Sequence, residues 1–408
     1  MCVMKLLLVA IAIAMLAQTA PSGRPRARDL NIKPGTMPTG ALNAITDVAG
    51  VTVGQTTVVE GKTVRTGVTA ILPHGDNLFQ AKVPGAVFVG NAFGKLAGST
   101  QVNELGTIET PIVLTNTLSV GTAVEAVVRW TLAQPGNENV RSVNALVGET
   151  NDGTLNDIRG LHVTGDHVRA AIAGARSGPV DEGAVGAGAG TIAFGWKGGI
   201  GTSSRVVRVG QDVWTVGVLV QTNYGGRLVI DGVPVWRELN PNRNLNRNLN
   251  RNLNRNLNLN RNPNPEPRNP TAEPPNPRTV EPRSSADGSC MIVVATDAPI
   301  DSRNLQRLAA RAVFALARTG STYSNGSGDF AIAFSTHPSL RVTDASGPQS
   351  RTVLPTDDVS PLFEGVMDAT EEAVDNSLLQ ATDVTANGRT VRALPIDELK
   401  AILKKYGR

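Results

Sequence analysis

The step from Gly288 to Ser289 is the point in the chain where residue types and spacing best allow covalent chemistry. It stands between an Asn-, Arg- and Pro-rich stretch at 240–288 and a continuous apolar run at 291–296, which is typical of a buried strand. A serine hydroxyl there can attack the preceding carbonyl, and glycine tolerates the distorted backbone that this attack requires. Hydrolysis of the ester would free Ser289 as a new N-terminus. Its α-amine, with a reference pKa near 8, can act as the base for its own hydroxyl.

Two alternatives to this prediction remain, one structural and one chemical. A Gly-Ser step also commonly marks a turn or the end of a linker. Cys290 is a rival nucleophile, because a cut one residue later would expose an N-terminal cysteine, although a free cysteine is more often a small buried core residue.

Metal chemistry is not indicated by the residues present. Cys2 and Cys290 are too few for a disulfide framework or a cysteine zinc site, and the four scattered histidines contain no HExxH-type pair. We therefore expect no zinc hydrolase and no cofactor.

Three polar segments follow or precede apolar runs and are candidates for the rest of a site. In the Gly-rich segment 325–329, the hydroxyl of Ser327 and the carboxylate of Asp329 can face one pocket and relay a proton. Segments 147–153 and 220–225 end apolar runs with polar residues and glycine, and loops at strand ends often carry sites. Composition alone predicts turns at all three places, with an Asx-type turn favoured at the first.

The glycine-rich run at 183–190 invites a phosphate-loop interpretation. It does not fit the Walker pattern, because no Gly-Lys-Ser/Thr follows. We expect close backbone packing or a flexible pocket wall instead. The sequence also lacks a Gly-x-Ser-x-Gly elbow, which disfavours an α/β-hydrolase.

The elements that must position these residues mix strands and helices, so the fold class is α/β (α+β). Strands are predicted at 86–89, 213–220, 291–296 and 330–334 from β-branched and apolar runs. Helices are predicted from Ser302, as a cap, to Thr319-Gly320, and at 361–379 and 396–406. The last part therefore reads strand, helix, strand, helix, with two helices to cover a small sheet.

Composition and charge bound the remaining possibilities. The chain has 408 residues, 40% of them hydrophobic and 18% charged, so it can build a sizeable core and is neither fibrous nor wholly disordered. The net charge of +4 arises in segment 240–288, which has eight arginines, four acidic residues and no lysine. The rest of the chain is neutral, so we expect no nucleic-acid partner.

Two segments lie outside the predicted folded part. Residues 1–20 predict a signal peptide, with Lys5 before an apolar run at 6–17 that is too short to span a bilayer comfortably. We therefore expect export, to the periplasm or beyond, and no membrane partner after signal removal; a short membrane-tethered end is the alternative. Segment 240–288 buries too little apolar surface to offset the entropy of ordering it, so it predicts a flexible linker rather than an Asn-rich β-element.

Several long residue strings point to one family. The strings at 287–289, 292–299 and 325–329, joined by others at 42–48, 66–70, 90–95, 115–117 and 197–204, cover most of the predicted folded chain. They closely resemble the self-processing L-aminopeptidase/D-esterase family, which includes the β-peptidyl aminopeptidases. The resemblance implies a four-layer αββα sandwich similar to N-terminal-nucleophile hydrolases, with its own strand connectivity. It also implies a cut between Gly288 and Ser289, giving an α chain of 21–288 and a β chain of 289–408 that form one catalytic domain.

The resemblance also assigns roles to individual residues. Ser289 matches the family nucleophile and Asn223 the side chain that helps to stabilise the oxyanion. Ser327 and Asp329 match a hydroxyl–acid pair near the nucleophile. The residues leave open whether this pair or the new amine is the general base.

Two further positions concern the substrate. Glu149 matches an acid that binds the free amine of the substrate in β-peptidyl members. Asn151 stands where some members carry tyrosine, so its role in the pocket carries over only in part. The insertion at 240–288 is a departure from the family pattern.

The sequence thus predicts an exported, self-cleaving serine aminopeptidase that releases N-terminal residues from short peptides, amides or esters. Derivatives of D- or β-amino acids are included among the open substrate classes, and the resemblance implies a tetramer of αβ units. Two alternatives remain: an acyltransferase of related architecture, whose known nucleophile is a threonine, and a non-catalytic binding protein.

Overall fold

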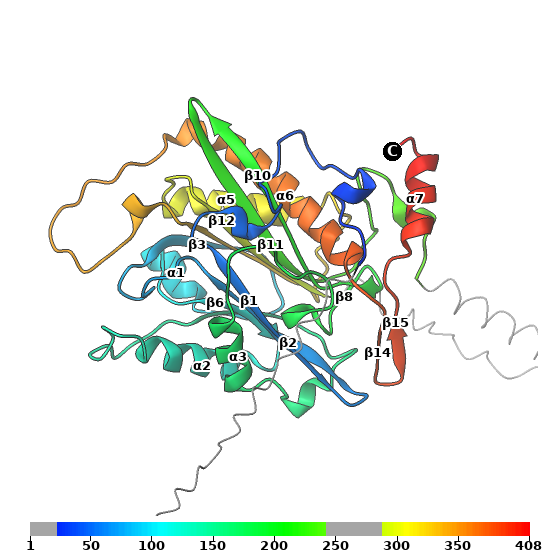
Figure 1. Cartoon of the computed structure of the whole chain (residues 1–408), viewed down its shortest axis with the longest axis horizontal. Helices are drawn as coiled ribbons and strands as arrows, with labels where there is room; N and C mark the ends of the chain where they lie inside the picture. The colour runs from blue at the N-terminus through cyan, green and yellow to red at the C-terminus, as the bar shows by residue number, and fades with distance from the viewer. Residues whose placement is uncertain (1–22, 242–287) are drawn as a thin grey trace, which may run out of the picture.

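The computed structural model describes residues 23–241 and 288–408. The predicted signal peptide and nearly all of the predicted linker lie outside these residues. The described residues form four layers, with two sheets stacked face to face and helices on both outer faces (Figure 1). The predicted αββα sandwich is confirmed.

One inner layer is a five-stranded sheet in the order β1-β2-β6-β7-β4. Its strands are β1 (Thr52–Glu60), β2 (Val64–Leu72), β6 (Ile112–Asn116), β7 (Leu146–Thr150) and β4 (Leu96–Ala97). Helices α2 (Val120–Leu132) and α3 (Gly165–Ala173) cover its outer face (Figure 1).

The other inner layer is a six-stranded sheet in the order β10-β11-β12-β13-β3-β5. Its strands are β10 (Ile200–Val209), β11 (Asp212–Asn223), β12 (Ser289–Thr296), β13 (Gly328–Ser335), β3 (Val83–Ala92) and β5 (Thr107–Ile108). Helices α5 (Ser302–Ala315) and α6 (Ser360–Leu379) cover its outer face (Figure 1). The remaining elements are α1 (Ser99–Leu105), α7 (Ile396–Lys405) and two small hairpins, β8–β9 (Ile192–Ala193, Trp196–Lys197) and β14–β15 (Val384–Ala386, Arg389–Val391).

Strand β12 shows how the sequence fills two cores at once. Its side chains alternate, so Met291 and Val293 pack between the two sheets, whereas Ile292 and Val294 pack under α5 and α6. A strand that is buried on both faces has no polar positions, which explains the continuous apolar run that the sequence shows.

Two sequence predictions need correction. The cap of α5 is Asp301, whose carboxylate accepts a hydrogen bond from the Asn304 N–H at 2.9 Å, and Ser302 is already helical. Strands β12 and β13 do not form a small sheet of their own. They pair in parallel through the α5 crossover and lie between β11 and β3, so strands from before and after 242–287 share one sheet.

Within 23–241 and 288–408, no helix is both long enough and apolar enough to cross a membrane.

Candidate active site

Ser289 is the first residue of β12, one of the two middle strands of the six-stranded sheet. Strand register places it directly opposite Asn223, the last residue of β11, and opposite Gly328, the first residue of β13. Three strand ends, one of them from β11 in the N-terminal part, therefore meet at the serine. This meeting point is set by long-range pairing.

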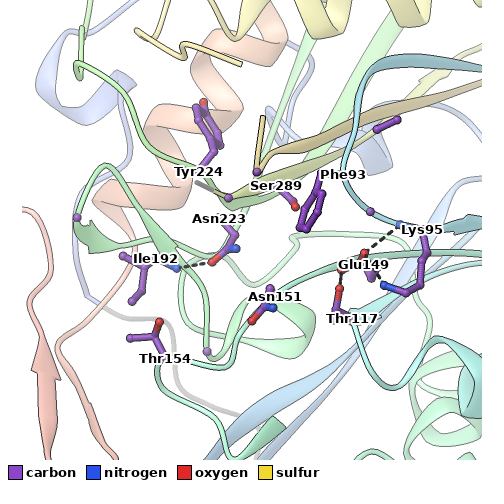
Figure 2. A pocket seen from close by; sticks show the side chains of 16 residues that line it. Phe93, Lys95, Thr117, Glu149, Asn151, Thr154, Ile192, Asn223, Tyr224 and Ser289 are labelled. Atoms are coloured by element: carbon purple, nitrogen blue, oxygen red, sulfur yellow. Dashed lines mark hydrogen bonds and ion pairs between the residues drawn. The ribbon is translucent and has the colours of Figure 1, made fainter. Parts of the chain in front are cut away.

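A pocket of about 850 Å³ opens beside Ser289. Figure 2 shows the serine hydroxyl directed into it, with side chains from both sheets around it. The lining residues are Ala92, Phe93, Gly94, Lys95, Thr117, Glu149, Asn151, Thr154, Gly190, Ile192, Gly195, Asn223, Tyr224, Gly288, Ser289 and Gly326. Of the six predicted site side chains, the pocket brings together Ser289, Asn223, Glu149 and Asn151.

Cys290 faces the other way. It alternates with Ser289 along β12, so its thiol is buried under α5 and α6 in the core. Burial raises the pKa of this thiol well above its ordinary value, which disfavours the reactive thiolate. The geometry therefore favours Ser289 over the rival nucleophile.

The side chain of Asn223 is held in one orientation. Its carbonyl oxygen accepts a hydrogen bond from the Ile192 N–H at 3.0 Å (Figure 2). The amide NH₂ group consequently points to the pocket side, where Figure 2 shows it. A fixed N–H donor beside a nucleophile can stabilise negative charge on a reacting carbonyl oxygen.

The backbone of Gly328 supplies a second donor. Its N–H lies 3.2 Å from the Ser289 hydroxyl oxygen and 3.2 Å from the carbonyl oxygen of Gly288. Gly288 itself has no room for a side chain, since a Cβ atom there would lie 1.9 Å from the Asn223 carbonyl oxygen. The sequence predicted a need for glycine at 288 from backbone flexibility; the structure adds a steric reason.

Ser327 and Asp329 form the predicted pair but lie outside the pocket lining. The Ser327 hydroxyl donates to one carboxylate oxygen of Asp329 at 2.8 Å, and burial raises the pKa of Asp329 to about 6. Asp329 lies in β13 opposite Cys290, rather than in the turn that composition favours. In the described residues no hydrogen bond joins this pair to the Ser289 hydroxyl, which accepts from the Gly328 N–H instead.

Glu149 enters the pocket from the opposite sheet. It lies near the end of β7, not in the turn that composition favours, and is 2% exposed. One carboxylate oxygen accepts a hydrogen bond from the backbone N–H of Lys95 at 3.0 Å. The same oxygen lies 3.7 Å from the ammonium nitrogen of the Lys95 side chain. The other oxygen accepts the Thr117 hydroxyl (Figure 2). A buried, oriented carboxylate of this kind can bind an ammonium group.

Asn151 is an exposed residue that lines the pocket. Its side-chain oxygen accepts the Gly153 N–H at 2.9 Å, which closes an Asx-type turn directly after β7. The amide oxygen is therefore engaged in shaping this loop.

Sequence reasoning missed a buried lysine behind the pocket wall. Lys197 lies opposite Ile192 in the β8–β9 hairpin, and its ammonium donates to the carbonyl oxygens of Gly188 and Gly198, each at 2.8 Å. Burial lowers the pKa of this lysine to about 7, although the negative charge of Asp152 acts in the opposite direction. These bonds tie down the hairpin that contains Ile192, whose N–H in turn orients the Asn223 side chain. The signal in the sequence is slight: a lysine that opens the glycine-rich string at 197–204.

The glycine-rich run at 183–190 belongs to the same wall and shows the predicted close backbone packing. A Cβ atom at Gly190 would lie 2.1 Å from the carbonyl oxygen of Arg65, and one at Gly188 would lie 2.5 Å from the Ile200 nitrogen. Gly190 also lines the pocket.

Comparison with known proteins decides the family. The model of peptidase family S58 matches residues 43–391, most of the chain. The chain belongs to peptidase family S58. A β-peptidyl aminopeptidase (BapA) of Sphingosinicella microcystinivorans is 41% identical over 98% of this chain and 96% of its own length.

Solved structures of this S58 protein's relatives agree with the fold. A β-aminopeptidase of a Burkholderia species is 36% identical, with a TM-score of 0.78 over 94% of this chain and 99% of its own. The L-aminopeptidase D-Ala-esterase/amidase of Ochrobactrum anthropi is 35% identical with the same TM-score and coverage. Its structure is described as a prototype of the serine aminopeptidases and as a variant of the Ntn hydrolase fold.

This S58 member is therefore a hydrolase of the aminopeptidase and amidase type. Within the residues that the structure describes, no group of three or more His, Cys, Asp or Glu side chains is placed to hold a metal ion.

Proposed function

We propose that the chain is a precursor that cuts itself between Gly288 and Ser289 and then acts as a serine aminopeptidase on β-amino acid substrates. The observation that carries the proposal is the position of the Ser289 hydroxyl. It lies at the pocket, beside the Asn223 amide and 3.2 Å from the Gly328 N–H, which also reaches the carbonyl oxygen of the bond to be cut.

The first step is an acyl shift. The Ser289 hydroxyl oxygen bonds to the Gly288 carbonyl carbon, the bond from that carbon to the Ser289 nitrogen breaks, and this nitrogen takes up the proton. The Gly328 N–H is placed to stabilise the negative charge that develops on the Gly288 oxygen. Water then hydrolyses the ester and leaves Ser289 with a free α-amine, which can serve as base for its own hydroxyl.

The second reaction uses the same serine on a substrate. Glu149 binds the substrate ammonium, the Ser289 hydroxyl attacks the carbonyl of the N-terminal residue, and Asn223 donates to the oxyanion. The amine leaves, and water releases the acyl group. A β-amino acid sets its ammonium one carbon further from the carbonyl, and we assign it because the relatives in two Sphingosinicella species are β-peptidyl aminopeptidases.

Gly288→Ala tests the self-cleavage geometry. The new Cβ atom would overlap the Asn223 carbonyl oxygen, so the scissile carbonyl must move away from the Ser289 hydroxyl and the Gly328 N–H. We expect self-cleavage to slow by at least ~100-fold, as misplacement by about 1 Å does in active sites. The time course on a denaturing gel measures this, with Gly75→Ala as a matched glycine control, since a Cβ atom there would have no other atom within 4 Å. Cleavage of G288A at the wild-type rate would contradict the account.

The pH profile tests the role of Asp329. In the proposed mechanism two groups must each lose a proton before the enzyme is active. One is the α-amine of Ser289, with a reference pKa near 8, and the other is the Asp329 carboxyl, whose pKa is raised to about 6. We expect log kcat/KM to rise with a slope of about two below pH 6 and about one from 6 to 8. Asp329→Asn should keep a slope near one throughout. A wild-type profile without a break near pH 6, or a break that survives in D329N, counts against this role.

Three further parts of the proposal concern the whole protein. We propose export through residues 1–20, a tetramer of αβ units, and substrates that are short peptides, amides or esters. A panel of L-, D- and β-amino acid p-nitroanilides tests the substrate class. The same panel with an added amine acceptor separates hydrolysis from acyl transfer, since only an acyltransferase would yield mainly the transferred product.

A further inference from the structure

The charges of the pocket are the starting point for a substrate assignment. Of the 16 residues that line it, only Glu149 and Lys95 have charged side chains; self-cleavage would add the α-amine of Ser289. They have opposite signs and lie side by side, with the Lys95 nitrogen 3.7 Å from a Glu149 oxygen. The binding end of the pocket is therefore dipolar.

The two side chains differ in their burial and in the number of polar partners they have. The Glu149 carboxylate is buried and accepts hydrogen bonds from the backbone N–H of Lys95 and from the Thr117 hydroxyl. The Lys95 side chain is 55% exposed, and in the described residues its ammonium has Glu149 as its one ion-pair partner. Figure 2 shows this ammonium turned back to the carboxylate from the segment between β3 and β4.

A substrate that carries only an ammonium fits this arrangement poorly. Its positive charge must approach Glu149 beside the Lys95 ammonium, and like charges at such a distance repel. A substrate that carries a carboxylate next to its ammonium satisfies both side chains, because each charge then meets its opposite.

We infer that the pocket takes an N-terminal β-aspartyl residue, with its ammonium on Glu149 and its free α-carboxylate on Lys95. In a β-aspartyl residue both charged groups are attached to the same carbon, which suits two receptor charges that lie side by side. The scissile carbonyl is one further carbon away, as in any β-amino acid. The inference rests on the proposed function, since it names the substrate of the same site.

The reaction remains a hydrolysis. The β-carbonyl carbon bonds to the Ser289 oxygen, its bond to the leaving nitrogen breaks, and that nitrogen takes up a proton. Water then cleaves the ester, so one water is consumed and free aspartate and a shortened peptide or amine are released.

The test compares three p-nitroanilides on the processed enzyme: β-aspartyl, β-homoalanyl and α-aspartyl. β-Homoalanyl is the matched control, because a methyl group replaces the carboxylate on the same carbon. We expect kcat/KM for β-aspartyl to exceed that for the other two by at least ~10-fold in the wild type. Lys95→Met should reduce the β-aspartyl to β-homoalanyl ratio by at least ~10-fold, and Lys95→Arg should restore most of it.

The outcomes separate this inference from the proposed function. Hydrolysis of β-homoalanyl without a preference for β-aspartyl, or a ratio that is the same in K95M, overturns the inference and leaves the β-aminopeptidase intact. Preference for α-aspartyl overturns the β-linkage. No hydrolysis of any β-substrate overturns the proposed function and with it the inference.

Inhibition of the wild type provides a readout that does not depend on the variants folding. Free aspartate should inhibit β-homoalanyl hydrolysis at concentrations at least ~10-fold lower than 3-aminobutyrate, its methyl analogue. Equal inhibition by the two products counts against the carboxylate site.

Discussion

Replacing Ser289 with alanine should yield one uncut chain without aminopeptidase activity. The variant removes the hydroxyl that, in the proposed reaction, attacks the Gly288 carbonyl and later forms the acyl-enzyme. The neighbouring donors, the Asn223 amide and the Gly328 N–H, remain, but they stabilise charge and form no bond. The measurement is a denaturing gel of purified protein together with p-nitroanilide turnover, over a long incubation.

Cys290→Ala is the matched control for this variant. Its side chain lies on the opposite face of β12, in the core under α5 and α6, so the loss of the thiol leaves the pocket in place. We expect C290A to cut itself between Gly288 and Ser289 like the wild type. Cleavage that persists in S289A but fails in C290A would assign the chemistry to the cysteine.

Asn223→Ala should lower kcat by about 10²–10³-fold. The amide is fixed by the Ile192 N–H, so it costs no reorganisation when negative charge develops on the substrate oxygen. Its donor is needed in the transition state, which places the loss in kcat with a much smaller change in KM. Steady-state kinetics on protein that has already processed itself measures the effect.

Asn223→Asp and Asn151→Ala sharpen this prediction. N223D keeps the oxygen that accepts from Ile192 but has no donor, so it should lose as much activity as N223A. N151A removes another pocket amide whose oxygen is engaged in its own turn, and we expect a loss below ~10-fold. Equal losses in N151A and N223A would show that general pocket polarity, and not the oxyanion contact, is at work.

The strand that begins at Ser289 and the mixed α/β class could be predicted because they depend on local patterns. Ser289 stands where a low-complexity stretch meets a continuous apolar run, and that run is the strand β12 with both faces buried. The helical segments 361–379 and 396–406 likewise agree with α6 and α7 within a residue or two, since an apolar stripe with a period near 3.6 is a local feature.

Other parts of the site depend on pairing between distant segments. Glu149 and Asn223 were expected in turns from composition, but neighbouring strands extend β7 and β11 through them. Strand order decides that Glu149 faces Ser289 from the other sheet, and composition carries no information on strand order. Lys95 and Lys197 escaped notice for the same reason, because a lone lysine acquires its role only from the carboxylate or carbonyl groups that the fold places around it.

The steric role of Gly288 is a further example. Glycine was expected there for backbone freedom, whereas the structure shows that any side chain would collide with the backbone of β11. Such a constraint arises from the register between Ser289 and Asn223, which no segment specifies by itself.

Mass spectrometry with N-terminal sequencing of the active, purified enzyme tests the central claim most directly. The account predicts two chains, with the smaller one beginning Ser-Cys-Met. Fully active protein in which Gly288 and Ser289 are still joined would contradict it.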